Sequence, residues 1–130
     1  MVEPEPPEGL DPVQEGIRLF NEEYFFEAHE VLEDLWKREH GKSKLFLQGL
    51  IQLCAAYHHF QNGNLIGALD LLRRGPDKMR KYPGRYMGID AGGLLDKVEG
   101  ARTQIELVHR GEGDRSKVVF PKSELPGGGA

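Results

Sequence analysis

The 130-residue chain has one cysteine, one tryptophan and no long apolar run. Its single thiol, Cys54, excludes an internal disulfide, and its position in an apolar segment predicts a small buried hydrophobic residue. The longest apolar run, residues 45–60, is interrupted by two glutamines and is shorter than the about 20 residues that a membrane span needs. These absences predict a soluble protein of a reducing compartment, the cytoplasm.

The chain also lacks a signal peptide and the common catalytic motifs. Its first residues form neither a basic nor an apolar stretch, and we find no phosphate loop, no G-x-S-x-G and no C-x-x-C. The net charge of −4 gives no overall bias towards nucleic acid or an anionic membrane. One basic stretch surrounds Pro76, but only Tyr82 and Tyr86 accompany it, which argues against a single-strand nucleic-acid platform. Its basic residues are Arg73, Arg74, Lys78, Arg80, Lys81 and Arg85.

Hydrophobic periodicity and capping residues predict a domain made of helices. Asp11-Pro12 and Asp90 are expected helix starts, because each aspartate can cap a helix and proline suits its first position. An interruption is expected at Gly75-Pro76, as a break or a kink, because proline lacks a backbone N–H and clashes with the preceding turn. The expected helices cover residues 11–21, 23–39, 43–61, 64–82 with that interruption, and 90–110.

The two ends of the chain differ in composition from this helical domain, which we assign to residues 11–110. Residues 1–10 are rich in proline and glutamate, which predicts a disordered arm. Residues 111–130 are rich in glycine, which predicts a flexible tail. One apolar segment within it, Val118 to Pro121, is expected to dock in extended form.

Residues forty positions apart resemble one another, which indicates an internal repeat. Phe20 corresponds to Phe60, and Ala28 to Ala68. The matching stretch covers one helix end, a loop and the next helix, and it resembles a tetratricopeptide hairpin, where a small residue allows close helix packing. Two units are too few for a solenoid. We therefore predict an all-α fold, a single bundle of about five helices built from two tetratricopeptide-like helical hairpins and a C-terminal helix.

Side chains that can carry chemistry are concentrated in the second and third predicted helices. His29 lies in the apolar stripe of the second helix, and Glu33 lies at its edge one turn later. In the third helix, three polar side chains share one narrow strip at spacings of four and seven residues. With two aromatic residues as walls, these groups predict a polar pocket at the core. Its residues are His29, Glu33, Trp36, Gln48, Gln52, Tyr57 and His59.

Three interpretations of this His–Glu cluster remain open. The first is a divalent metal site with His29, Glu33 and His58 as ligands, because H-E-x-x at this position resembles a zincin helix. Glu33 replaces the second histidine of that motif, and Glu30, its catalytic base, points away from the core. The second is a pocket for a small polar ligand or a peptide group. The third is a structural network in which the polar groups satisfy one another and fix the helix register.

Several ordered motifs follow one another along the chain: Phe20-Asn21, F-F-E-A-H-E-V-L-E of residues 25–33, Trp36, F-L-Q-G-L-I-Q of residues 46–52, Ala55-Ala56, His58, Gly63-Asn64 and Gly67-Ala68. Together they resemble the family known as domain of unknown function 309. The resemblance runs from about Leu10 to Val108 and implies a small all-helical domain with no agreed biochemical activity.

Together, these patterns favour a helical binding or scaffold module over an enzyme. Its expected partner is a small polar ligand or a protein, with no membrane or nucleic-acid partner, and self-association is left open. The alternative is a metal-dependent hydrolase or small-ligand-binding protein centred on His29 and Glu33.

Overall fold

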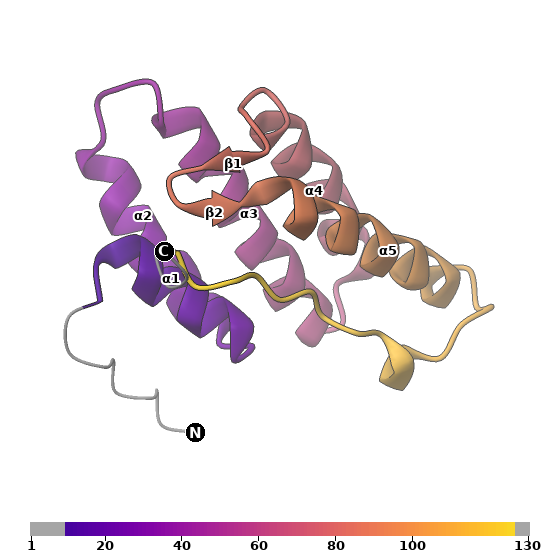
Figure 1. Ribbon diagram of the computed structural model, residues 1–130. Helices are drawn as coiled ribbons and strands as arrows, with labels where there is room; N and C mark the ends of the chain where they lie inside the picture. The colour runs from indigo at the N-terminus through magenta and orange to yellow at the C-terminus, as the bar shows by residue number, and fades with distance from the viewer. Residues whose placement is uncertain (1–9, 127–130) are drawn as a thin grey trace.

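The computed structural model describes residues 10–126, and within this range the chain forms an all-α fold with one small hairpin (Figure 1). The predicted fold class is confirmed. Residues 1–9, the greater part of the predicted arm, and residues 127–130 lie outside the described range. The helices are α1 (Pro12–Asn21), α2 (Phe25–Arg38), α3 (Lys44–Gln61), α4 (Leu65–Met79) and α5 (Ala91–His109), and the strands are β1 (Arg85–Tyr86) and β2 (Ile89–Asp90), with a short 3-10 helix, η1 (Arg115–Lys117), after α5.

The expected capping residues begin two of these helices. Asp11 accepts a hydrogen bond from the Gln14 N–H at 2.8 Å, and the Gln14 side chain accepts one from the Asp11 N–H at 3.0 Å. This reciprocal capping box satisfies two N–H groups that a helix end leaves unpaired. Asp90 begins α5 in a similar way, since its carboxylate accepts from the Gly93 N–H at 3.1 Å. No helix among the described residues is long and apolar enough to cross a membrane.

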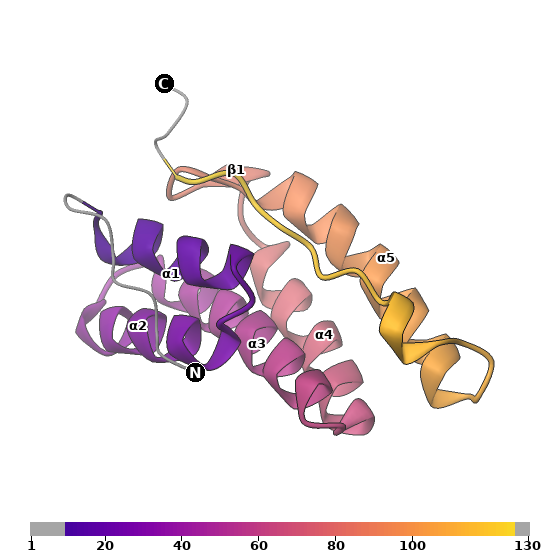
Figure 2. The same ribbon diagram turned by 90° about the horizontal axis from the view of Figure 1, so that it is seen from below.

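The central helix is α3, which packs against α2 on one side and α4 on the other. Figure 2 shows α1 and α5 on the same side of this three-helix layer. The core beneath them is aromatic: Tyr57 of α3 lies fully buried, with its ring 5.3 Å from Phe25 and 6.0 Å from Phe20. Ala28 and Ala68, the expected close-contact residues of the two hairpins, are also fully buried.

Of the two forms of interruption predicted at Gly75-Pro76, the break is wrong, because α4 continues through both residues, and the kink stays a prediction. Part of the clash that proline causes in a helix is with the Cβ of the residue before it, and Gly75 has no Cβ. This glycine also lets α4 approach α3 closely. A Cβ added at Gly75 would lie 2.8 Å from the Gly49 carbonyl oxygen, and one added at Gly49 would lie 2.7 Å from that of Gly75. The two backbones therefore meet at a glycine-glycine crossing.

The hairpin of β1 and β2 was not predicted. Its strands are antiparallel, with Tyr86 opposite Ile89, and the turn residues Met87 and Gly88 have positive φ values of 53° and 76°. Two-residue hairpin turns need this conformation, which is usually supplied by Asn-Gly or Asp-Gly. The aromatic rings of Tyr82 and Tyr86 hold the segment on α3, with centroids 5.3 and 4.9 Å from Phe46.

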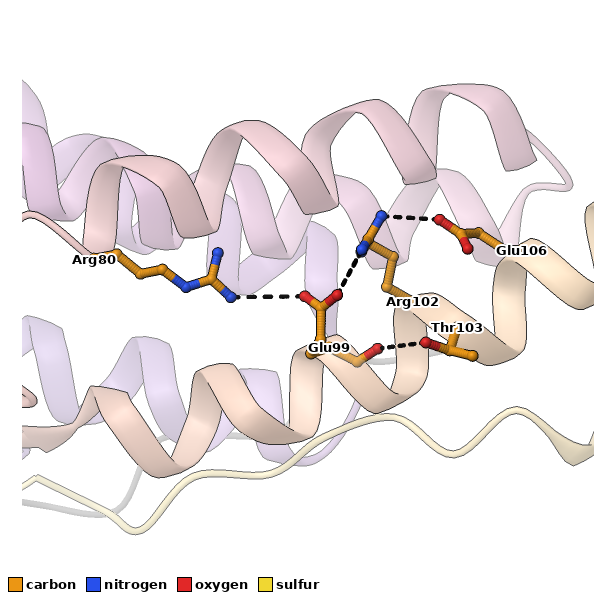
Figure 3. Close-up of polar contacts among 5 residues, drawn as sticks. All are labelled: Arg80, Glu99, Arg102, Thr103 and Glu106. Carbon is orange, nitrogen blue, oxygen red and sulfur yellow. Dashed lines mark hydrogen bonds and ion pairs between the residues drawn. The ribbon is translucent and has the colours of Figure 1, made fainter.

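A row of charges joins α4 to α5 (Figure 3). Glu99 receives a hydrogen bond from Arg102 at 2.5 Å and lies 3.6 Å from the guanidinium of Arg80, the C-cap residue of α4. Arg102 also bonds to Glu106 at 2.8 Å. These contacts lower the pKa of Glu99, chiefly through the hydrogen bond from Arg102, and raise the pKa of Arg102.

The segment after η1 runs back between α5 and α1 (Figure 2). The expected extended docking of Val118 to Pro121 is observed, since the Phe120 ring lies 5.1 Å from Phe25 and Pro121 is buried. The flexibility predicted for residues 111–130 is a statement about motion, which the structure does not test, so it stays a prediction.

Candidate functional site

Two residues of the predicted site, His29 and Glu33, belong to a row of charged side chains along α2 that ends at Lys37. The Nδ1 atom of His29 lies 3.4 Å from Oε2 of Glu33, and Oε1 of Glu33 lies 3.7 Å from Nζ of Lys37. Each pair is four residues apart, which places the side chains one above another on the helix surface. The His29 and Glu33 side chains are 29% and 37% exposed. Since no polar or charged residue is buried in the described part of the chain, this row lies at the edge of the core.

An exposed aromatic residue lies beside this row. The Phe26 side chain is 47% exposed, and its ring is nearly parallel to that of His29, with centroids 6.5 Å apart. The same ring lies 5.3 Å from His58 of α3. Phe26 was not among the residues of the pocket predicted from the sequence. Its position next to the buried Phe25, about 100° around the helix, was the signal that it faces outward.

Two shielded nitrogen atoms on α2 have no hydrogen-bond partner among the described residues: Nδ1 of His29 and Nε1 of Trp36. Seven residues separate them, so they project from the same side of the helix within about 20°. The indole ring of Trp36 is covered by the ammonium group of Lys44, 4.3 Å from its centroid. The indole N–H of Trp36 is thus a shielded donor without an acceptor among the described residues, which costs about 1–3 kcal/mol, so an acceptor group that reaches it would be favoured.

Of the remaining residues of the predicted pocket, Gln52 and His59 contact side chains outside α2. Oε1 of Gln52 accepts from Lys78 of α4 at 2.9 Å, whereas Nδ1 of His59 lies 3.4 Å from the Asn64 side chain. Gln48 is half-buried on α3. Tyr57 is enclosed in the aromatic core, where its hydroxyl has no partner among the described residues and burial raises its pKa. The structure brings His29 and Glu33 together, and a pocket of all seven residues stays a prediction.

The three proposed metal ligands do not converge. Among the described residues, no group of three or more His, Cys, Asp and Glu side chains is arranged to hold a metal ion. His29 and Glu33 are neighbours, but Nε2 of His58 lies 3.2 Å from the Asn62 amide, and the Phe26 ring contacts both imidazoles. A catalytic zinc usually has three protein ligands, and this arrangement supplies two.

Cys54 is unsuited to nucleophilic catalysis. It is fully buried on α3, and this burial raises the pKa of its thiol to about 12. Because the thiolate is the reactive form, the residue acts as a core side chain, as expected.

Residues 13–71 match the model of the "Domain of unknown function (DUF309)". The chain is 33% identical over 90 residues to the uncharacterized protein YpuF of Bacillus subtilis, an alignment that covers 65% of this chain and 50% of YpuF. It is 28% identical over 94 residues to an uncharacterized protein of Aquifex aeolicus, covering 69% of this chain and 28% of that protein. The chain thus spans half or less of the length of these relatives.

Proposed function

Residues 13–71 match the domain of unknown function 309 family, and we propose that the chain is a helical binding module. Its partner, a protein or peptide, contacts the side of α2 that carries Phe26, His29, Glu33 and Trp36, which we call the α2 face. The observation that carries this proposal is the pair of shielded nitrogens on one side of α2 that have no hydrogen bond among the described residues: Nε1 of Trp36, and Nδ1 of His29, which lies 3.4 Å from the Glu33 carboxylate.

The chemistry of the α2 face suits main-chain groups. The indole of Trp36 is a donor only, the imidazole of His29 donates or accepts according to its tautomer, and the carboxylate of Glu33 accepts. A peptide group offers one donor and one acceptor. Phe26 adds an exposed aromatic ring of the kind that anchors protein interfaces.

The shape of the face favours a macromolecular partner over an enclosed small molecule. A depression of about 340 Å³ includes Glu33, and its other lining residues are Glu30, Asp34 and Lys37, all from α2. Small-molecule sites are usually concave and walled by several elements. A surface formed by one helix is better matched to a partner helix or strand.

Two further features belong to this proposal. The first is a duplicated helical hairpin, supported by the full burial of both Ala28 and Ala68, which would make the module a two-unit scaffold. The second is a cytoplasmic location, supported by the single buried thiol and by the absence of a membrane-spanning helix among the described residues.

The test is a quantitative comparison of proteins that co-purify with the wild-type chain, Phe26→Ala, Glu33→Ala and the matched control Ile66→Ala. Ile66 is the second residue of α4, as Phe26 is of α2, and is 69% exposed. We expect a partner that is lost with the first two variants and retained with the control. The purified partner should then shift the indole N–H resonance of Trp36, the only tryptophan in the chain. Equal recovery with all four proteins would refute the proposal.

A metal-dependent activity is the second candidate, favoured by the 3.4 Å separation of His29 and Glu33 at the spacing of two helix ligands. Titration with zinc or manganese, followed by Trp36 fluorescence, tests it. Stoichiometric binding that is lost in His29→Ala would favour this candidate over the binding module.

A further inference from the structure

A second site lies on the opposite side of the three-helix layer, where the chain holds its own C-terminal segment. Residues 118–126, which we call the strap, follow η1 and run in extended form between α5 and α1 (Figures 1 and 2). Side chains from α1, α2, α3 and α5 contact the strap, and we call the surface that they form the groove. This groove shares no residue with the α2 face.

Most polar contacts in the groove hold the main chain of the strap. The side-chain amide of Asn21 donates to the Ser123 carbonyl at 2.7 Å and accepts from the Ser123 N–H at 2.8 Å. One amide thus pairs with both main-chain groups of one residue, as a neighbouring β-strand would. Three further side chains contact the main chain: Gln104 accepts from Val119 N–H at 3.3 Å, Lys97 donates to Lys122 O at 3.1 Å, and Gln14 donates to Pro126 O at 2.7 Å.

One strap side chain is recognised by an apolar pocket. The ring of Phe120 lies 5.1 Å from Phe25, 5.5 Å from Tyr57 and 5.7 Å from Phe60. Pro121 follows it and is buried. Proline restricts the residue before it to extended conformations. In an aromatic-proline pair, the aromatic ring therefore projects from an extended main chain.

Two basic side chains, Arg115 before the strap and Lys122 within it, contact the ends of two helices. Arg115 donates to the carbonyls of Phe60 and Gln61 at 2.9 and 3.0 Å, at the end of α3. The ammonium group of Lys122 donates to the carbonyl of Asn21, the last residue of α1. Helix C-termini attract cations, so the groove favours a segment with basic residues on either side of its aromatic anchor.

The strap does not fill its groove. On one side a depression of about 860 Å³ lies between the strap and Glu23, Phe60 and Gln61. On the other side a depression of about 470 Å³ is lined by residues 119–122 of the strap and by Lys97, Gly100, Ala101 and Gln104 of α5. The groove residues Asn21, Phe25, Tyr57 and Phe60 lie within the segment that matches the family, residues 13–71, whereas the strap lies beyond it.

We propose that this groove is a docking site for an extended segment of a partner protein, with an aromatic residue followed by proline and flanked by basic residues. The strap occupies the site in cis and competes with that partner. A tethered segment has an effective concentration of about millimolar, so the wild-type chain admits only a partner that binds more strongly than its own strap.

The probe is a fluorescent synthetic peptide with the sequence of residues 115–126. The full-length Phe120→Ala variant, whose strap has lost its anchor, should bind this peptide about tenfold or more tightly than the wild-type chain. A peptide that itself carries Phe120→Ala should bind that variant about tenfold more weakly, and adding Asn21→Ala to the variant should weaken binding of the unmodified peptide.

A second variant and a wild-type measurement keep the proposal testable if Phe120→Ala unfolds. Ser123→Pro removes the N–H that pairs with Asn21 and leaves the aromatic anchor in place. In the wild-type chain, about 1 mM peptide should accelerate hydrogen exchange at the main-chain N–H groups of Val119 and Ser123 by displacing the strap.

Three results would overturn the proposal. A folded variant that does not bind the peptide, or a wild-type chain whose strap exchange is unaffected by it, would show that the groove holds only a covalently attached tail. A wild-type dimer that is lost in Phe120→Ala would assign the site to a second copy of this chain instead of a partner.

Discussion

Glu23 and Gly63 adopt the same left-handed conformation in the turns of the two hairpins, with φ values of 67° and 82°. The next residues, Tyr24 and Asn64, donate their N–H groups to the carbonyls five residues earlier at 2.9 and 2.8 Å. Two turns forty residues apart therefore share one backbone geometry. This equivalence extends the sequence repeat to the backbone and supports the proposed duplication of the hairpin.

The shared turn predicts opposite effects for two substitutions. A side chain in the left-handed region costs about 1–2 kcal/mol, and glycine avoids this cost while losing more conformational entropy on folding. We expect Glu23→Gly to raise the free energy of unfolding by about 0.5–1 kcal/mol and Gly63→Ala to lower it by about 1 kcal/mol. Urea denaturation measures both. Similar destabilisation by the two substitutions would show that the turns are not equivalent.

The glycine-glycine crossing of α3 and α4 gives a second prediction. Alanine is a better helix former than glycine by about 1 kcal/mol, but a Cβ at Gly49 would lie 2.7 Å from the Gly75 carbonyl oxygen, a backbone atom. We therefore expect Gly49→Ala to destabilise the protein by about 1–3 kcal/mol, the range for overpacking.

Gly100→Ala is the matched control for Gly49→Ala. Gly100 lies inside α5, and no neighbouring side chain or distant backbone atom lies within 4 Å of the place that an added Cβ would take. This substitution should stabilise the protein by about 0.5–1 kcal/mol. Melting temperatures that rise for both variants would show that the helices can separate at the crossing without cost.

The helices were predictable because their signals are local. The capping box at Asp11, the cap at Asp90 and the apolar stripes act within one or two helical turns. The errors arose where distant contacts decide the structure. Pro76 remains within α4 because its neighbour Gly75 packs on α3, and the β1–β2 turn forms at Met87-Gly88 without the usual Asn or Asp because aromatic residues hold its flanks on Phe46.

The ion pairs between α4 and α5 predict a dependence of stability on pH. The pKa of Glu99 in the folded protein is lowered from its ordinary value of 4.5. The contribution of Glu99 to the free energy of unfolding is therefore complete above pH 4.5, and it is lost as the pH falls through the lower pKa of the folded protein. In Glu99→Gln, the loss of stability on acidification should be smaller than in the wild type.

The Glu99 side chain is 46% exposed, so solvent screening limits its effect at neutral pH to about 0.3–1 kcal/mol. Guanidinium denaturation would screen the pairs, so urea denaturation at pH 7 and at pH 3.5 is the suitable measurement. An identical change of stability with pH in both proteins would contradict the prediction.

The candidate site was only partly predictable. The pairing of His29 with Glu33 follows from their spacing on one helix. The positions of Gln52, Tyr57 and His59 depend on what packs against α3, and sequence periodicity does not identify the neighbouring helix. Lys78 from α4 holds Gln52, and Phe120 from the strap encloses Tyr57. Both partners lie far along the chain.

The last prediction concerns Glu33, where the structural and functional interpretations of the α2 face diverge. The Glu33 side chain is 37% exposed and lies 3.4 Å from His29 and 3.7 Å from Lys37. If the row of charges is structural, Glu33→Gln should lower the free energy of unfolding by only about 0.3–0.5 kcal/mol. If Glu33 instead serves a ligand, function has been retained at the expense of stability, and the variant should be neutral or more stable while partner binding is lost. Thermal unfolding of the wild type, Glu33→Gln and the charge-matched control Glu30→Gln, each with and without a chelator, separates these outcomes. A small destabilisation specific to Glu33→Gln, unaffected by chelator and accompanied by unchanged partner recovery, would restrict the role of this carboxylate to stabilising α2.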